Sequence, residues 1–276
     1  MPSTHLPGLA VIGGGPAGLM AAETARAAGV EVDLFDAKGS VGRKVLIAGK
    51  GGLNLTHGEA FPQFCRRFGE RSGEVSRWLQ DFGPDDLRAW AAGLGVDTFV
   101  GSSGRVFPAD LKAAPLLRGW VRRLRDQGVR FHVQHRWLGL DEQGAHRFRT
   151  PGGEHRFQAG ATVLAMGGGS WPQLGSDGAW TAPLADAGIN IAPLQPANCG
   201  FDVGWSEHFA QRFAGAPIKP LRLALAGKGP PHWRQGECVA TATGLEGSLV
   251  YALSAQLRDT ITRDGEAVLL ADLVPG

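Results

Sequence analysis

Three glycines near the N-terminus have the spacing of a phosphate-binding turn. Gly13, Gly15 and Gly18 give the pattern G-x-G-x-x-G, with Pro16 and Ala17 between the last two. In such a turn the first glycine allows a tight bend, the second lets a pyrophosphate approach the backbone, and the third lets the helix pack closely on the strand. The helix start then presents free N–H groups and a positive dipole end to phosphate. The expected chemistry is the binding of a phosphorylated ligand.

The segments around these glycines place the turn between a strand and a helix. Residues 9–12 form the apolar run LAVI, which is typical of a strand buried on both faces of a parallel sheet. Residues 19–28 favour a helix that Gly29 ends. Residues 31–36 predict a second strand ending in Asp36, whose carboxylate can accept hydrogen bonds from the hydroxyls of an adenosine ribose. The order strand, turn, helix, strand and acid predicts a dinucleotide-binding fold.

A glycine-rich loop with interleaved basic residues follows the second strand. Such a loop suits wrapping around a phosphorylated ligand, and the alternative is a flexible surface loop with solvated charges. Beyond it lie short polar side chains and one histidine, although a lone histidine is more often structural or solvated. The candidate cofactor contacts are Ala37, Lys38, Gly42, Arg43, Lys44, Gly49, Asn54 and Thr56, and His57 is a candidate substrate contact.

Residues 13–18, 42–43 and 49–56 (GKGGLNLT) together resemble the two-dinucleotide-binding-domain flavoproteins. More narrowly, they resemble a bacterial family of NAD(P)/FAD-dependent oxidoreductases, also described as aminoacetone oxidase family FAD-binding enzymes and related to the bile-acid-inducible flavin reductases. That family usually carries Ser-Gly-x-Gly-Arg-Cys-Asn-x-Thr-Asn at the third site. This chain has Gly52 and Leu53 in place of the arginine and cysteine, so a role of that pair does not transfer. The resemblance implies FAD as the cofactor.

Two further segments extend the resemblance. The run AMGGGS at 165–170 follows a predicted strand and is similar to the family's Ala-Thr-Gly-Gly element, which implies that Ala165, Gly167 and Gly168 contact the cofactor. The run GRVFP at 104–108 resembles the family's Gly-Arg-x-Phe-Pro segment near the substrate. Arg105 is therefore a candidate contact for an anionic substrate or cofactor, because a guanidinium binds carboxylates and phosphates bidentately. The alternative is an arginine that only holds a loop.

The whole pattern predicts an α/β protein with a Rossmann-like FAD-binding domain over residues 1–192. This domain is expected to contain a parallel sheet, a helical cap at about 59–95 and a β-meander at about 137–159, from which the chain returns through a strand at 161–165. A change in proline spacing predicts a boundary near 193. Residues 193–276 resemble the family's inserted β-rich domain, with strands at 221–225 and 266–273 and one helix at 249–262. Because family members continue beyond the final DLVP, this second domain is expected to be incomplete.

Composition excludes several other classes of protein. Hydrophobic residues make up 43% and charged residues 20%, as in a globular chain, and the net charge of +2 is too small to indicate a nucleic-acid or membrane partner. Cys65, Cys199 and Cys238 lack C-x-x-C spacing, so neither a disulfide framework nor a metal site is indicated. With neither a signal-peptide pattern nor a long apolar run, a cytoplasmic location is expected.

By resemblance the chain is expected to be an oxidoreductase that passes hydride through flavin N5 to or from a small-molecule substrate. NAD(P)H is a candidate electron donor, although a second G-x-G-x-x-G is absent. The pattern indicates neither a general base nor an oligomeric state. Three alternatives stay open: a non-catalytic or degenerate flavin-fold fragment, an FAD-dependent RNA-modifying protein suggested by the arginine-rich stretch 110–127, and binding of NAD in place of FAD.

Overall fold

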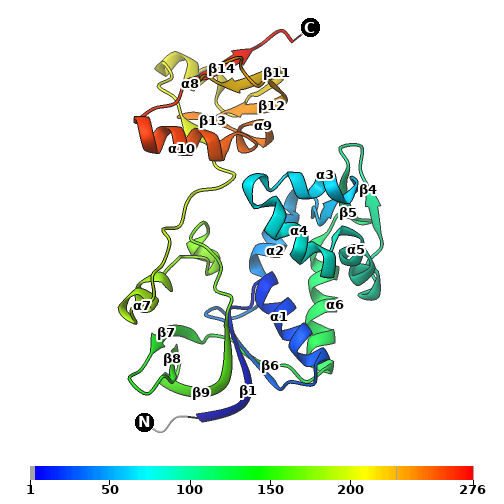
Figure 1. Ribbon diagram of the computed structural model, residues 1–276, viewed down its shortest axis with the longest axis vertical. Coiled ribbons are helices and arrows are strands. Elements are labelled where there is room, and N and C mark those ends of the chain that lie inside the picture. Colours follow the sequence, from blue (N-terminus) through cyan, green and yellow to red (C-terminus); the bar gives the residue numbers. More distant parts are fainter. Residues whose placement is uncertain (1–3, 228, 276) are drawn as a thin grey trace. The chain divides into compact units, whose positions relative to one another are not determined.

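The computed structural model describes residues 4–227 and 229–275, except for the side chain of Lys50. The chain divides into two compact units, Met1–Ala192 and Pro193–Gly276 (Figure 1). Each unit has its own sheet and its own buried core. No helix in the described part of the chain is long and apolar enough to cross a membrane.

The first unit is built on a six-stranded mixed sheet. Its order is β6-β2-β1-β9-β8-β7, in which β6, β2, β1 and β9 run parallel and β8 and β7 continue antiparallel. This order puts the N-terminal strand at the centre, as a Rossmann-like fold requires. The strands are β1 (Thr4–Ile12), β2 (Val32–Phe35), β6 (Arg130–His132), β7 (Arg136–Leu140), β8 (His146–Thr150) and β9 (Gly153–Leu164).

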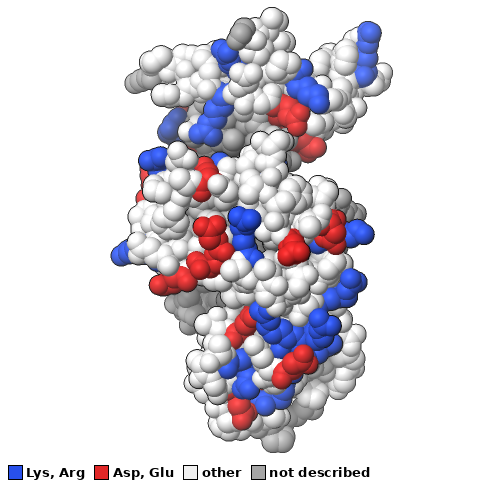
Figure 2. Space-filling model, turned by 90° about the vertical axis from the view of Figure 1, so that its right-hand side faces the viewer, with Lys and Arg blue, Asp and Glu red and all other residues white. Residues whose placement is uncertain are grey.

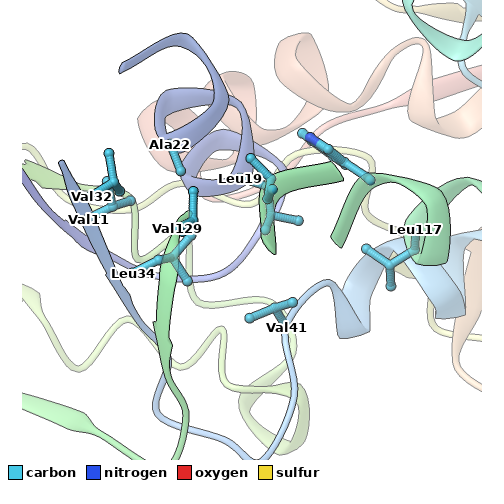
Figure 3. Packing of buried hydrophobic residues seen from close by; sticks show 10 residues of the cluster. Val11, Leu19, Ala22, Val32, Leu34, Val41, Leu117 and Val129 are labelled. Carbon is cyan, nitrogen blue, oxygen red and sulfur yellow. The ribbon is translucent and has the colours of Figure 1, made fainter. Parts of the chain in front are cut away.

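Side chains alternate along β1, so this strand contributes buried residues to both faces of the sheet. Val11 packs into a cluster with helices α1 (Pro16–Ala27) and α6 (Ala113–Asp126), which lie side by side on one face (Figures 1 and 3). Ala10 and Ile12 point to the other face and join aromatic residues of β8 and β9. The expected strand buried on both faces is therefore confirmed. It also begins earlier than the apolar run.

The predicted β-meander is partly wrong. Residues 155–158, expected to be the last meander strand, and residues 161–164 of the expected return strand belong to the single strand β9. Its first half pairs antiparallel with β8 and most of its length pairs parallel with β1. One strand can serve both neighbours because each edge of a strand offers its own hydrogen-bonding groups. The expected parallel sheet and the meander are thus one mixed sheet.

Helices and a small sheet fill the stretch between β2 and α6. The three-stranded antiparallel sheet has the order β3-β5-β4, and one of the helices begins at Pro84. Helix α7 (Thr181–Asp186) packs against β7 later in the chain. The elements here are α2 (Arg43–Ala48), β3 (Thr56–His57), α3 (Phe61–Arg66), α4 (Ser72–Asp81), α5 (Pro84–Gly93), β4 (Thr98–Val100) and β5 (Arg105–Pro108).

The second unit is a five-stranded antiparallel sheet in the order β10-β13-β12-β11-β14. The single helix predicted for 249–262 is wrong, since two helices meet at Leu253. Leu253 is buried there together with Leu249, Val250 and Leu257, so the break lets both helices face the same core. The elements are β10 (Phe201–Asp202), α8 (Glu207–Phe213), β11 (Pro217–Leu225), β12 (Arg234–Ala240), β13 (Gly244–Glu246), α9 (Ser248–Tyr251), α10 (Ser254–Asp264) and β14 (Leu269–Asp272).

Candidate functional site

The glycine turn lies between β1 and α1, as the sequence predicts. Gly13 has φ +114°, and a Cβ there would collide with the carbonyl of Ala165. A Cβ on Gly18 would collide with the carbonyl of Gly13, so close packing of the helix on the strand requires glycine at both positions. Gly15 caps α1 in an extended conformation, and a Cβ there would meet nothing within 4 Å. The turn is therefore closed on the protein side and open at Gly15.

That open side faces a cavity of about 440 Å³ within the first unit. Its lining includes the glycine turn, the end of β2, the start of α2, the start of β7 and the loop after β9. The first turn of α1 leaves N–H groups without intrahelical partners at this edge. Of the predicted cofactor contacts, the cavity is lined by Gly13, Gly15, Pro16, Ala17, Asp36, Ala37, Gly42, Arg43, Lys44, Ala165 and Gly167.

Asp36 connects the glycine turn with the start of α2, and we call these two segments together the cradle. Its buried carboxylate accepts hydrogen bonds from the backbone N–H of Gly14 at 3.0 Å and of Lys38 at 2.8 Å. The guanidinium of Arg43 donates to the same carboxylate at 2.7 Å. Two of these bonds go to Oδ1 and one to Oδ2, so Oδ2 keeps a lone pair for a further donor such as a ribose hydroxyl.

Arg43 has one donor that the protein does not satisfy. Its Nε donates to the carbonyl of Leu174 at 2.9 Å and its Nη2 to Asp36, but Nη1 is buried without a hydrogen-bond partner. A buried guanidinium nitrogen without a hydrogen-bond acceptor is costly, and an anion or a water molecule beside it would remove this cost. Next to it, Lys44 donates to the hydroxyl of Ser170 at 3.1 Å. The donor set therefore fits the pyrophosphate of a dinucleotide.

Another wall of the cavity is made by His135, Arg136 and Trp137 at the start of β7, which the sequence did not predict. It is continued after β9 by Leu174, Gly175, Ser176, Asp177, Ala179 and Trp180. Arg136 forms an ion pair with Asp177, with Nη2 2.9 Å from Oδ2. Burial alone would raise the pKa of Asp177, but the bonds from Arg136 and from the N–H of Ala179 hold it below its usual range. A charged residue next to an aromatic one at a strand start is too common a pattern to have identified this wall.

Six of the predicted cofactor contacts lie outside the cavity lining. Gly49 ends α2 and packs against Ala113, and Thr56 is buried in β3. Asn54 is exposed. The carbonyl of Gly168 accepts a hydrogen bond from Ser176 at 2.9 Å. The six residues are Gly18, Lys38, Gly49, Asn54, Thr56 and Gly168.

The two candidate substrate contacts face each other in a different place. His57 and Arg105 are paired across β3 and β5, and neither lines the cavity. The ring of His57 lies 3.2 Å from the carbonyl of Ser103 and accepts from the N–H of Glu59 at 3.2 Å, so local contacts satisfy it. Arg105 is exposed.

Charge is mixed over the surface drawn in Figure 2, where acidic side chains lie among the basic ones. On α6, Arg118, Arg122 and Arg125 are exposed, whereas Arg123 pairs with Glu23 at 2.9 Å. Among the described residues, no group of three or more His, Cys, Asp or Glu is placed to hold a metal ion.

The mixed sheet, the glycine turn and the buried acid after β2 define a Rossmann-type fold. Residues 7–261 match the model of the HI0933-like protein Rossmann domain. The chain therefore belongs to the HI0933-like family of FAD-binding Rossmann proteins.

One curated relative is the 3-dehydro-bile acid delta(4,6)-reductase of Clostridium scindens. It is 30% identical over 269 residues, which are 97% of this chain and 64% of the relative. The chain thus spans less than two thirds of that relative's length.

Two solved structures align with parts of the chain. The open conformation of a flavocytochrome c3 fumarate reductase covers 60% of this chain and 34% of its own, with 19% identity and a TM-score of 0.49. The 3-ketosteroid-delta4-(5alpha)-dehydrogenase from Rhodococcus jostii RHA1, in complex with 4-androstene-3,17-dione, covers 80% of this chain and 57% of its own, with 14% identity and a TM-score of 0.48.

Proposed function

We propose that this chain is an FAD-dependent oxidoreductase acting on a small-molecule substrate. The observation that carries the proposal is a cavity that is open at Gly15 and lined by Arg43, whose buried Nη1 has no protein partner. An anion bound between them would satisfy this donor and the free N–H groups at the start of α1. When bound, FAD supplies hydride transfer through N5 of its flavin ring, and NAD(P)H is the candidate electron donor.

Each wall of the cavity has a distinct part in this proposal. The α1 N-terminus and Arg43 bind the pyrophosphate, and the free lone pair of Asp36 binds a ribose hydroxyl. Phe35 and Trp137 contribute apolar surface that excludes water from the cavity. The charges are thereby held in a low-dielectric site, where their interactions are stronger than in water.

The substrate is proposed from the relative alone. Because that relative is named a reductase of a 3-dehydro-bile acid, we propose a small unsaturated organic molecule that accepts hydride as the substrate of this chain. An unsaturated 3-dehydro-bile acid is the first probe. Reoxidation of the reduced, FAD-loaded protein on adding the probe without oxygen would support this substrate class, and no reoxidation would remove it.

An absorbance spectrum of the purified chain, followed by identification of the nucleotide released on denaturation, tests the cofactor. Two flavin bands between about 350 and 500 nm and released FAD are expected. A folded, colourless protein that takes up no added FAD would support a degenerate flavin-fold fragment. Released NAD would replace FAD as the cofactor.

Gly15→Val tests the cradle itself. The backbone of Gly15 is extended and a side chain there meets no protein atom, so the variant should fold normally while its side chain occupies the space for phosphate. Gly39→Val is a matched control, because Gly39 is exposed, has no atom near its Cβ position and does not line the cavity. We expect Gly15→Val to lose FAD and Gly39→Val to keep it. Normal FAD content in a folded Gly15→Val protein would contradict the cradle.

A further inference from the structure

The loop after β9 forms one side of the nucleotide cavity. It contains a short 3-10 turn at Pro172–Leu174 and an isolated bridge between Trp171 and Ser176. The loop residues that line the cavity are Leu174, Gly175, Ser176, Asp177, Ala179 and Trp180. A ligand in the cavity would therefore touch this loop along much of its length.

Most attachments of this loop lie on its own side of the cavity. The carbonyl of Gly168 accepts from the Ser176 hydroxyl at 2.9 Å and from the Gly178 N–H at 3.2 Å. The indole of Trp180 donates to the carbonyl of Gly167 at 2.9 Å. These bonds fix the loop to the end of β9, from which it emerges. They would persist if the opposite side of the cavity opened.

The loop is also attached to other elements, since Arg43 and Lys44 of α2 bond to Leu174 and Ser170, and Arg136 of β7 pairs with Asp177. Arg136 belongs to β7, which is separated from β9 by β8 in the sheet, so the pair joins the loop to a distant edge. Asp177 is also oriented by the N–H of Ala179, which donates to its Oδ1 at 3.1 Å. Both residues line the cavity, and their side chains are 37% and 25% exposed, so the pair is also open to solvent.

We propose that the Arg136–Asp177 pair is a clasp that holds the loop across the cavity and slows release of the bound dinucleotide. Both side chains are positioning residues, because they act through the loop and take no part in hydride transfer. This inference rests on the proposed binding of FAD. It predicts that the rate of FAD dissociation depends on the charge of these two side chains.

The test compares FAD dissociation from the wild-type chain, Asp177→Asn and Arg136→Gln. Each protein is loaded with FAD and diluted, and the fluorescence of released flavin is followed. Asp177→Asn keeps an oxygen for the Ala179 N–H but removes the negative charge. We expect either variant to release FAD about tenfold faster than the wild type, which corresponds to a modest loss of interaction free energy. High salt should accelerate release from the wild type more than release from the variants.

Glu154→Gln is the matched control. Glu154 pairs with Arg147 at 2.6 Å across β8 and β9 of the same sheet, with similar exposure, and neither residue lines the cavity. This variant should release FAD at the wild-type rate. The charge reversal Arg136→Asp with Asp177→Arg should restore slow release, which a purely structural loss would not do. Thermal melting without FAD checks that each variant folds.

The outcomes separate the clasp from the proposed function. A folded wild-type chain that binds no FAD would overturn both. A wild-type chain that binds FAD, with variants that release it no faster than Glu154→Gln, would overturn the clasp alone. The clasp alone would also be overturned if the charge-reversed double variant released FAD as fast as the single variants.

Discussion

The indole of Trp137 donates a hydrogen bond of 3.1 Å to Nδ1 of His146, directly behind the wall of the nucleotide cavity. Because an indole only donates, Nδ1 must be unprotonated, and Nε2–H then donates to Oγ1 of Thr162 at 2.7 Å. Burial lowers the pKa of His146 below its ordinary value of 6.5. The ring is therefore neutral, and it positions Trp137.

This buried histidine predicts a pH dependence of folding. As the pH falls below 6.5, His146 becomes protonated in the unfolded chain. In the folded chain it stays neutral to a lower pH, because burial lowers its pKa. The free energy of unfolding should therefore decrease as the pH falls from 6.5 to the pKa of His146 in the folded chain. Below that pKa, His146 should cause no further change. Urea unfolding at pH 8 and pH 5 measures the loss. His146→Gln should reduce it, whereas replacing the exposed His155 by Gln should not.

Arg43→Gln should weaken FAD binding by about ten- to a hundredfold, the range expected for one charge-assisted hydrogen bond. The reason is the loss of Nη1, the buried donor that no protein group satisfies. Titration of the FAD-free protein with FAD measures the affinity. Replacing the exposed Arg105 by Gln should leave it unchanged, since Arg105 does not line the cavity. Equal affinities for the two variants would contradict this role of Arg43.

Asp33 stabilises the pairing of β2 with β6. It is 1% exposed, and Arg130 donates to both of its oxygens at 2.8 and 2.7 Å. Burial alone would raise its pKa, but Arg130 and His132 lower it from 3.8 to about 2. A lowered acid pKa stabilises the fold above the unfolded pKa and loses this effect as the pH falls toward 2.

Asp33→Asn should therefore cost about 2 kcal/mol of stability at pH 7, as expected from a shift of nearly two pKa units. The difference from the wild type should shrink between pH 4 and pH 2. Urea unfolding over this range measures it. Glu31→Gln is the control, because Glu31 binds the same Arg130 from an exposed position and should cost little. A pH-independent difference for Asp33→Asn would contradict the ion-pair explanation.

Glu23 joins α1 to the helices beside it. Its carboxylate accepts from the indoles of Trp90 at 3.1 Å and Trp120 at 2.7 Å and from Arg123 at 2.9 Å. Glu23→Gln should cost about 1 to 3 kcal/mol, because an amide has a single acceptor oxygen for three donors. Denaturant unfolding measures the cost. Glu74→Gln, which breaks an exposed pair with Arg71, should cost less than about 1 kcal/mol.

The local sequence pattern was sufficient to predict the glycine turn of the cradle. Gly13 and Gly18 are needed by a turn in which neighbours in sequence are neighbours in space, Gly15 lies on its open side, and the apolar run before them forms a buried strand. The carboxylate of Asp36 reaches this turn because β1 and β2 pair in parallel and end together. The sequence alone was therefore sufficient for the class of fold and for one wall of the cavity.

Proximity in sequence was misleading after α2. Gly49, Asn54 and Thr56 follow Arg43 closely, but none of them lines the cavity. The chain turns away there because Leu53 and Leu55 bond to the backbone of the later segment around β5. That pairing depends on residues more than fifty positions further along the chain, and no local pattern reveals it.

The far wall was decided by the tertiary structure. His135, Arg136 and Trp137 reach the cavity because β7 starts beside the end of β2, where the His135 N–H donates to the carbonyl of Asp36 at 2.9 Å. Asp177 meets Arg136 because the segment between β6 and β7 passes the end of β2, where the loop after β9 also lines the cavity. The sequence by itself determined the phosphate-binding turn, since its geometry is local. Only the tertiary structure determined which distant side chains complete the cavity, because their contacts depend on segments far apart in the sequence.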